Sequence, residues 1–298
     1  MTKLSVSVII LTFNEEIHIR RCIKNAFRIA KDVFVVDCYS TDKTVEIAKE
    51  SGATVIQHQY INQAQQFQWA LENCPINTEW TLRMDADEYL TDKLIEEIKR
   101  KSMSLPGNVS GVNFSLRVKF MDHYIRFGTL HPIRILRMWR TGRAYMEQRW
   151  MDERMVLKDG DVISFKHRFI DDNLKGLTFW TQKHNIYSSR EILVELDKRY
   201  SLFDRGNDNS LKGRNRMKVF YYSFPKFLRA FFYFFIRYIF FLGFLDGIPG
   251  FIWLTLQAYW YRFLVDAKLL EMEKKLGKNP SKEKILSYVQ KDLGIKVL

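Results

Sequence analysis

The sequence contains few cysteines and lacks an export signal. Its 298 residues include three cysteines, Cys22, Cys38 and Cys74. Their spacing fits no zinc site and their odd number leaves no complete set of disulfides, so we expect the reduced thiols of a cytosolic protein. The N-terminus leads directly into a β-prone run and lacks the apolar region and cleavage site of a signal peptide. We therefore do not expect an exported, disulfide-stabilised domain.

No apolar run in the sequence is predicted as a transmembrane helix. A helix that spans a bilayer needs about 20 residues that are almost free of charge. The aromatic stretch from Tyr221 to Phe244 contains Arg237, and a turn at Gly247 separates it from a second apolar stretch, Phe251 to Leu264. We expect two amphipathic helices that lie in the membrane interface. The alternative is a helical hairpin that is buried against the N-terminal part of the chain or a homodimer partner.

In the interfacial interpretation, the C-terminal helices bind an anionic membrane surface through two kinds of residue. Arginine side chains lie at the level of the lipid phosphates, and aromatic rings lie in the headgroup belt. The residues expected to contact the membrane in this way are Arg229, Phe231, Phe235, Arg237 and Phe240.

The formal net charge of +13 predicts an anionic partner. Nucleic acid, a phospholipid surface and a phosphorylated substrate all fit this charge. The aromatic residues disfavour nucleic acid, because they form a continuous apolar run and do not alternate with basic residues as stacking platforms do. A basic nucleic-acid-binding protein is therefore the weaker alternative, and we expect no nucleic-acid partner.

Alternating strand and helix patterns predict a parallel α/β sheet in the N-terminal part of the chain. Short β-branched runs are predicted as strands at Val6 to Thr12, Asp32 to Asp37 and Ala53 to Gln57, and a further strand begins at Trp80. Segments with helical spacing of apolar residues separate these runs. Strands that alternate with helices form parallel sheets, and ligands bind at the carboxyl ends of such strands.

Polar residues occupy the carboxyl ends of three predicted strands, namely Thr12 with Asn14, Asp37, and Asp85 with Asp87. Alternate residues of a strand share a face, so Asp85 and Asp87 are predicted to point in the same direction. Converging carboxylates repel each other unless a cation lies between them, and oxygen ligands of this kind suit Mg2+ or Mn2+. The alternative is an acidic helix start with Thr91 as its N-cap.

Three segments together resemble the signature blocks of family-2 inverting glycosyltransferases. These segments are Val6 to Glu15, Val35 to Thr44 and Asp85 to Glu88. The resemblance implies the GT-A fold, a Rossmann-like α/β fold with a mostly parallel sheet flanked by helices. It also implies a metal-dependent enzyme that transfers a sugar from a nucleotide-sugar donor and uses Mn2+ or Mg2+. We expect this enzyme to transfer one sugar and not to be processive, because Glu147 to Trp150 only superficially resembles the motif of processive synthases.

The resemblance assigns expected roles to individual residues. Thr12, Phe13, Asn14 and Glu15 would form the nucleotide pocket, with Phe13 stacked on the base. Asp37 would accept hydrogen bonds from the base, Asp85 would face the ribose, and Asp87 would hold the metal on the diphosphate. An aromatic face suits a base, and a carboxylate suits the imide of uracil or the amino edge of guanine. We expect UDP as the nucleotide, although Tyr39 makes the turn after Asp37 bulkier than in many relatives.

Inverting transfer needs a carboxylate that removes the proton of the acceptor hydroxyl, opposite the leaving diphosphate. Asp152 and Glu153 occupy the position of this base in the family, and Glu153 is favoured. The alternative is a solvated turn that pairs with neighbouring arginines. His167, at the end of a strand predicted from Ile163, is a candidate ligand of the metal or the diphosphate, with a hydrogen-bonded strand-end histidine as the alternative.

These features predict a GT-A catalytic domain over residues 1–195, with a nucleotide-sugar half to about residue 100 and an acceptor half after it. An aromatic-rich, amphipathic helical extension over residues 196–298 would associate with the membrane. We expect a lipid-linked saccharide acceptor, in the assembly of lipopolysaccharide, capsule or another surface polysaccharide. The enzyme would be peripheral to the cytoplasmic face of the inner membrane. A polyprenyl-phosphate glycosyltransferase is the rival enzyme.

Overall fold

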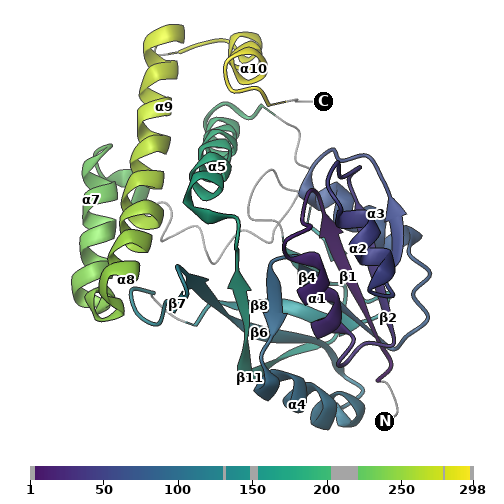
Figure 1. Ribbon diagram of the computed structural model, residues 1–298. Helices are drawn as coiled ribbons and strands as arrows, with labels where there is room; N and C mark the ends of the chain where they lie inside the picture. The colour runs from purple at the N-terminus through teal and green to yellow at the C-terminus, as the bar shows by residue number, and fades with distance from the viewer. Residues whose placement is uncertain (1–3, 130–131, 148–153, 203–220, 278, 296–298) are drawn as a thin grey trace. The chain divides into compact units, whose positions relative to one another are not determined.

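The computed structural model describes residues 4–129, 132–147, 154–202, 221–277 and 279–295 (Figure 1). The chain divides into two compact units. The first comprises residues 1–125 and 131–176, and the second comprises residues 126–130 and 177–298. This division lies at the start of helix α5 (Gly176–Tyr200), which continues through residue 195.

The first unit contains a nine-stranded sheet (Figure 1). Its strands, in spatial order, are β3 (Thr54–Gln57), β2 (Asp32–Asp37), β1 (Val6–Thr12), β4 (Trp80–Asp85), β8 (Arg134–Arg140), β6 (Val109–Phe120), β11 (Asp161–Asp172) and β5 (Glu88–Leu90), with β7 (His123–Tyr124) paired to β6. The first four are parallel to one another, as predicted. Strand β8 is antiparallel to β4 and β6, whereas β6 and β11 are parallel.

Helices and a small hairpin cover the two faces of this sheet. The helices α1 (Ile19–Ala26), α2 (Thr44–Glu50) and α4 (Asp92–Lys101) bury their apolar residues in one core, against one face. Helix α3 (Gln63–Asn73) and the hairpin of β9 (Ala144–Met146) and β10 (Met155–Leu157) form the core of the other face. Strand β1 contributes to both cores because successive side chains of a strand point to opposite faces. The result is a three-layer α/β architecture.

Local sequence signals explain where two of these helices begin. The Thr91 side chain accepts a hydrogen bond from the Leu94 N–H, so it caps α4, as the alternative interpretation of the acidic segment expected. The Asn62 side chain accepts one from the Gln65 N–H at 2.8 Å and caps α3. Each cap satisfies a backbone donor that has no partner within the helix. A short 3-10 turn, Ser102–Ser104, extends α4.

The second unit is helical in its described part. It contains α5, α7 (Leu228–Phe235), the π-helical turn η3 (Ile236–Phe240), the 3-10 turn η4 (Gly243–Asp246), α8 (Gly247–Leu254), the π-helical turn η5 (Thr255–Trp260), α9 (Tyr261–Leu276) and α10 (Lys282–Lys291). The Asp246 carboxylate accepts the N–H groups of Arg126 and Phe127, both at 2.8 Å. These bonds join the segment 126–130 to the helices of this unit.

The two arginines predicted to contact lipid phosphates are buried in the second unit, so this prediction is wrong. Arg229 is 4% exposed and forms an ion pair with Asp266 of α9, which is 1% exposed. Arg237 is 7% exposed, and its Nε donates to the Gly128 carbonyl oxygen. Both partners are distant in sequence. The arginines stabilise the helical packing.

The three phenylalanines predicted to contact the membrane are exposed. Phe231, Phe235 and Phe240 are 51%, 41% and 70% exposed. Within the described residues, no single helix is long and apolar enough to cross a membrane, but Leu228–Phe240 and Gly243–Leu276, bent by 74° at their junction, satisfy that criterion as a pair.

Removal of Asp266 should destabilise the protein strongly. The Asp266→Ala variant leaves the buried Arg229 guanidinium without its carboxylate, which typically costs about 3 to 5 kcal/mol. The matched control is Lys275→Ala, which breaks the more exposed ion pair with Asp292 and should cost less than about 1 kcal/mol. Urea unfolding followed by circular dichroism measures both. Equal losses in the two variants would contradict the role assigned to the Arg229–Asp266 pair.

Candidate functional site

The carboxyl ends of three adjacent parallel strands meet at one edge of the sheet. Strand β1 lies between β2 and β4, with Thr12 paired to Asp37 and Leu11 paired to Asp85. The Thr12 hydroxyl donates to Asp37 Oδ1 at 2.9 Å. The convergence expected from the sequence is therefore present, and it places the residues that follow each strand around the same edge.

Asp37 is fully buried, and its carboxylate is already saturated with hydrogen bonds. Oδ1 accepts from the hydroxyls of Thr12 and Ser40, and Oδ2 accepts from the Ser40 N–H at 2.8 Å and from Gln57 Nε2 at 3.2 Å. Each oxygen thus already accepts two hydrogen bonds in this structure, and the carboxylate links the ends of β1 and β2. The hydrogen bond from the base to Asp37 stays a prediction.

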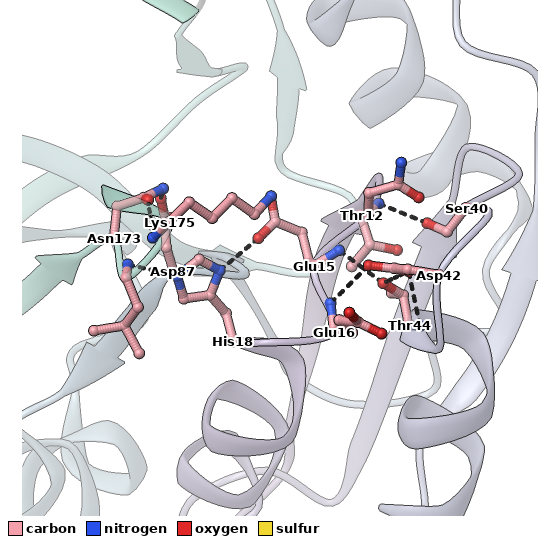
Figure 2. A network of polar contacts seen from close by, with 12 residues as sticks. Thr12, Glu15, Glu16, His18, Ser40, Asp42, Thr44, Asp87, Asn173 and Lys175 are labelled. Atoms are coloured by element: carbon pink, nitrogen blue, oxygen red, sulfur yellow. Dashed lines mark hydrogen bonds and ion pairs between the residues drawn. The ribbon is translucent and has the colours of Figure 1, made fainter. Parts of the chain in front are cut away.

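The loops after β1 and β2 are joined by hydrogen bonds between side chains and backbone N–H groups (Figure 2). The Asn14 N–H donates to Ser40 Oγ at 2.8 Å, and the Thr41 N–H donates to Asn14 Oδ1 at 2.8 Å. The Glu15 N–H donates to Thr44 Oγ1 at 2.7 Å. The two loops thus form one connected rim, in which Asn14 is a structural link.

Two aromatic side chains on this rim are open to solvent. Phe13 and Tyr39 are each 57% exposed. Phe13 has the accessible ring face that a stacking role requires. Tyr39 has φ +59°, a left-handed conformation that is uncommon for an aromatic residue. The sequence marked Tyr39 only as a bulky turn residue.

Asp85 lies in a cluster of charges that the sequence did not reveal. Arg137 of β8 is 6% exposed and donates to Asp85 Oδ2 at 3.3 Å and to the Glu88 carboxylate. Arg83 Nε donates to Asp85 Oδ1 at 3.3 Å. Burial opposes ionisation of Asp85, but Arg83 and Arg137 outweigh it and hold the pKa of this carboxyl well below its ordinary value. Asp85 is therefore an ionised group, with its side chain 35% exposed.

Asp87 is held from both its side chain and its backbone. Asn173 Nδ2 donates to Asp87 Oδ2 at 2.9 Å (Figure 2). The Asp87 carbonyl oxygen accepts from the Asp172 N–H at 3.0 Å and from Arg21 Nη2 at 3.1 Å. Strand β11 therefore ends beside the expected metal ligand, and Asn173 and Arg21 are site residues that the sequence did not indicate.

His167 does not join Asp87 in the structure. Strand β11 continues five residues beyond His167 to Asp172, whose N–H bonds to Asp87. At the usual rise of a strand, those five residues span roughly 16 Å. The His167 N–H donates to Glu97 of α4 instead, at 3.0 Å. His167 is therefore not a ligand of the same metal as Asp87, because the strand extends five residues beyond the predicted end.

The donor set at Asp87 fits a divalent cation that is shared with a diphosphate. In the described parts of the chain, no group of three or more His, Cys, Asp or Glu side chains is placed to hold a metal. Mg2+ rarely needs such a cage, because it usually binds one or two carboxylates together with substrate phosphates and water. Asp87, oriented by Asn173, supplies one carboxylate of this kind.

Glu15 belongs to a buried hydrogen-bonded network that lies beside Asp87. His18 Nδ1 lies 2.6 Å from Glu15 Oε2, and Lys175 Nζ donates to Glu15 Oε1 at 2.8 Å (Figure 2). Burial acts to raise the pKa of Glu15, but the bonds to His18 and Lys175 outweigh it, so the pKa lies below its ordinary value of 4.5. His18 and Lys175 were not identified from the sequence.

The predicted catalytic bases, Asp152 and Glu153, lie outside the described residues. The roles of these two carboxylates stay predictions.

Comparison with known proteins identifies the first unit. The family model of glycosyl transferase family 2 matches residues 7–149. The chain carries a glycosyl transferase family 2 domain. The domain has the GT-A fold that the three sequence segments implied. The match includes the carboxyl ends of β1, β2 and β4.

Several curated relatives are named as glycosyltransferases. An uncharacterized glycosyltransferase of Rickettsia typhi is 43% identical over 94 residues, which is 32% of this chain and 32% of that protein. The lipopolysaccharide core biosynthesis glycosyltransferase LpsC of Rhizobium meliloti is 26% identical over 165 residues, 54% of this chain and 60% of that protein. The first of these matches thus spans about a third of the relative's length.

Two solved structures illustrate the similarity of the chain to proteins of known structure. Staphylococcus aureus TarS aligns with a TM-score of 0.36 and 16% identity, over 85% of this chain and 55% of that one. Glucosyl-3-phosphoglycerate synthase of Mycobacterium tuberculosis, in complex with Mn2+, UDP and glucosyl-3-phosphoglycerate, aligns with a TM-score of 0.33 and 19% identity, over 38% of this chain and 44% of that one.

Acidification should weaken the fold through Glu15. Its pKa is lower in the folded than in the unfolded chain, so the unfolded chain binds more protons as the pH falls below about 5, and stability decreases. In Glu15→Gln this contribution is absent, and the decrease in stability between about pH 5 and pH 3 should be shallower. Urea unfolding at a series of pH values measures the slope. Identical slopes for the two proteins would contradict the contribution of this network.

Proposed function

We propose that this protein is an inverting glycosyltransferase that moves one sugar from a nucleotide-sugar donor to an acceptor hydroxyl. The observation that carries this proposal is the meeting of Phe13, Asp85 and Asp87 at one sheet edge within a glycosyl transferase family 2 domain. These residues supply an aromatic face and two carboxylates where α/β sheets bind their ligands.

Each residue has a distinct task in the proposed donor complex. Phe13 presents an exposed ring against which a base stacks, and UDP is the favoured nucleotide. Asp85, which Arg83 and Arg137 keep ionised, accepts hydrogen bonds from the ribose hydroxyls. Asp87 would hold Mn2+ or Mg2+ on the diphosphate, where a bound cation neutralises the charge of the leaving group.

The transfer step is a single displacement. The acceptor oxygen bonds to the anomeric carbon from the face opposite the diphosphate, whose oxygen departs with the bonding electron pair. A carboxylate on the acceptor side removes the hydroxyl proton, and Glu153, with Asp152 as the neighbouring alternative, is proposed for this role. Inversion at the anomeric carbon follows from the single step.

Replacement of Asp87 should abolish metal-dependent catalysis. Asp87→Asn keeps the side chain's size but removes the charge that binds the cation, so donor hydrolysis and transfer should fall by about 100-fold or more. Asp122→Asn, which changes an exposed carboxylate in the turn between β6 and β7, is the matched control and should retain activity. The assay measures release of the nucleoside diphosphate from UDP-, GDP- and dTDP-sugars with Mn2+ or Mg2+. Full wild-type activity in excess EDTA would contradict the metal role of Asp87.

We also propose that the acceptor is a lipid-linked saccharide, which the second unit meets at the cytoplasmic face of the inner membrane. Large apolar side chains are exposed along residues 228–251, and Leu228, Phe240, Leu245 and Ile248 are each more than half exposed. Soluble proteins rarely expose large continuous apolar surfaces without a partner. A membrane interface supplies that partner.

Three phenylalanines of this surface have neighbouring rings. The ring centroids of Phe231 and Phe235 lie 6.3 Å apart, and those of Phe235 and Phe240 lie 6.0 Å apart. We call these three residues the phenylalanine cluster. Because Arg229 and Arg237 are buried, the described part of the unit supports attachment through apolar insertion, and the net charge of +13 adds attraction to anionic lipids.

Replacement of the phenylalanine cluster should release the protein from membranes. The triple variant Phe231→Ser, Phe235→Ser and Phe240→Ser loses the inserted apolar area and should remain at the bottom of a flotation gradient with phosphatidylglycerol vesicles. The matched control replaces three exposed apolar residues of the first unit, Ile61, Ile133 and Val162, with serine and should float like the wild type. A wild-type protein that stays at the bottom as a monomer without detergent would contradict membrane attachment. If the wild type is a dimer and the triple variant is a monomer, the cluster is a homodimer contact.

A further inference from the structure

A lysine beyond the last long strand lies between two carboxylates of the proposed donor site. Lys175 Nζ donates to Glu15 Oε1 at 2.8 Å, and the Lys175 N–H donates to Asn173 Oδ1 at 3.0 Å. The same Asn173 side chain donates to Asp87 Oδ2 at 2.9 Å. The short segment from Asn173 to Lys175 therefore connects Asp87 with Glu15 (Figure 2).

Hydrogen bonds identify the charge state of His18 in this network. His18 is fully buried, and its Nε2 accepts the Leu174 N–H at 2.8 Å, so this nitrogen carries no proton. The proton is therefore on Nδ1, which donates to Glu15 Oε2 at 2.6 Å. His18 is neutral in this arrangement, and the positive charge that balances Glu15 comes from Lys175.

Hydrogen bonds fix the backbone of this segment, and an ion pair with Glu15 holds the end of the lysine side chain. His18 bonds to the Leu174 N–H, and Asn173 bonds to the Lys175 N–H. The lysine side chain is a flexible four-carbon chain that ends in a compact point charge, which suits it to bind phosphate oxygens. Glu15, its partner in this ion pair, carries one negative charge, whereas a diphosphate carries more.

We propose that Lys175 is a donor-binding residue that exchanges Glu15 for the diphosphate of the nucleotide-sugar. The proposal rests on the proposed glycosyltransferase function and adds a phosphate-binding cation to it. Glu15 holds Lys175 in place before the donor binds. Lys175 then binds the diphosphate near Asp87, to which Asn173 connects it by hydrogen bonds. Asn173 is a positioning residue for both groups.

The alternative is that the Lys175–Glu15 ion pair only connects two loops. The two roles predict different dependence on the phosphates of the ligand. A phosphate-binding lysine contributes to the affinity for a nucleoside diphosphate but not to the affinity for the nucleoside. If the lysine is purely structural, its replacement changes the shape of the pocket and weakens the binding of both ligands equally.

Binding of UDP and of uridine to three variants separates these roles. The same comparison is made between GDP and guanosine, and between dTDP and thymidine. Lys175→Met should weaken UDP binding in the presence of Mn2+ by about 10-fold or more and change uridine binding by less than about twofold. Lys175→Arg, which keeps the charge, should retain most of the UDP affinity. Lys101→Met, which breaks the ion pair between Lys101 and Glu97 in α4, is the control and should bind both ligands like the wild type. Calorimetry and NMR titration measure the strong and weak affinities.

The outcomes also separate this proposal from the function on which it rests. UDP affinity that is unchanged in Lys175→Met, or an equal loss of UDP and uridine affinity, would overturn the role of Lys175 and leave the proposed function intact. Failure of the folded wild type to bind UDP, GDP and dTDP would contradict the proposed function, and the role of Lys175 with it.

Discussion

The parallel pairing of β1 with β2 and β4 brings the polar groups of the site together. The interiors of these strands are apolar because both faces of the sheet are covered, so polar side chains appear where the strands end. The register then places the end of β1 beside the ends of its two neighbours. Asp37 is buried at this position, and four hydrogen bonds compensate for its desolvation. The rim that carries Phe13 therefore depends on a saturated buried carboxylate.

Charge balance distinguishes the carboxylates around this edge. Asp85 pairs with Arg83 and Arg137, Asp172 pairs with Arg21, and Glu15 pairs with Lys175. Asp87, by contrast, receives its side-chain hydrogen bond from the neutral amide of Asn173. The negative charge of a carboxylate that is oriented by a neutral donor remains available to a cation, whereas an arginine largely neutralises the charge of the carboxylate with which it pairs. This difference explains why Asp87 is the residue proposed to hold the metal.

The features that could be predicted from the sequence depend on neighbouring residues or on a pattern of residue types that repeats along the chain. The predicted bounds of β1 and β2 match the structure, and the Thr91 cap follows from one residue and its position. The features that were missed depend on residues far apart in sequence. Arg137 reaches Glu88 from another strand, and Lys175 lies 160 residues from Glu15.

The wrong predictions have the same physical origin. His167 was assigned to the metal because its strand was predicted to end there, whereas the strand continues through the buried Phe169 and Ile170 to Asp172 and pairs with neighbouring strands. Arg229 was assigned to the membrane because its neighbours are aromatic, whereas its partner Asp266 lies on a later helix. The sequence pattern indicates the average environment of a segment. Whether one charged side chain in that segment is buried depends on its individual partner, which can lie far away in the sequence.

The central claim is that the carboxyl edge of β1, β2 and β4 binds a nucleoside diphosphate. A crystal structure of the protein with UDP and Mn2+ tests it most directly. The account predicts the base against Phe13 and the metal on Asp87, with Lys175 turned from Glu15 toward the diphosphate. A nucleotide bound at another surface of the first unit, with Phe13 and Asp87 unchanged, would contradict it.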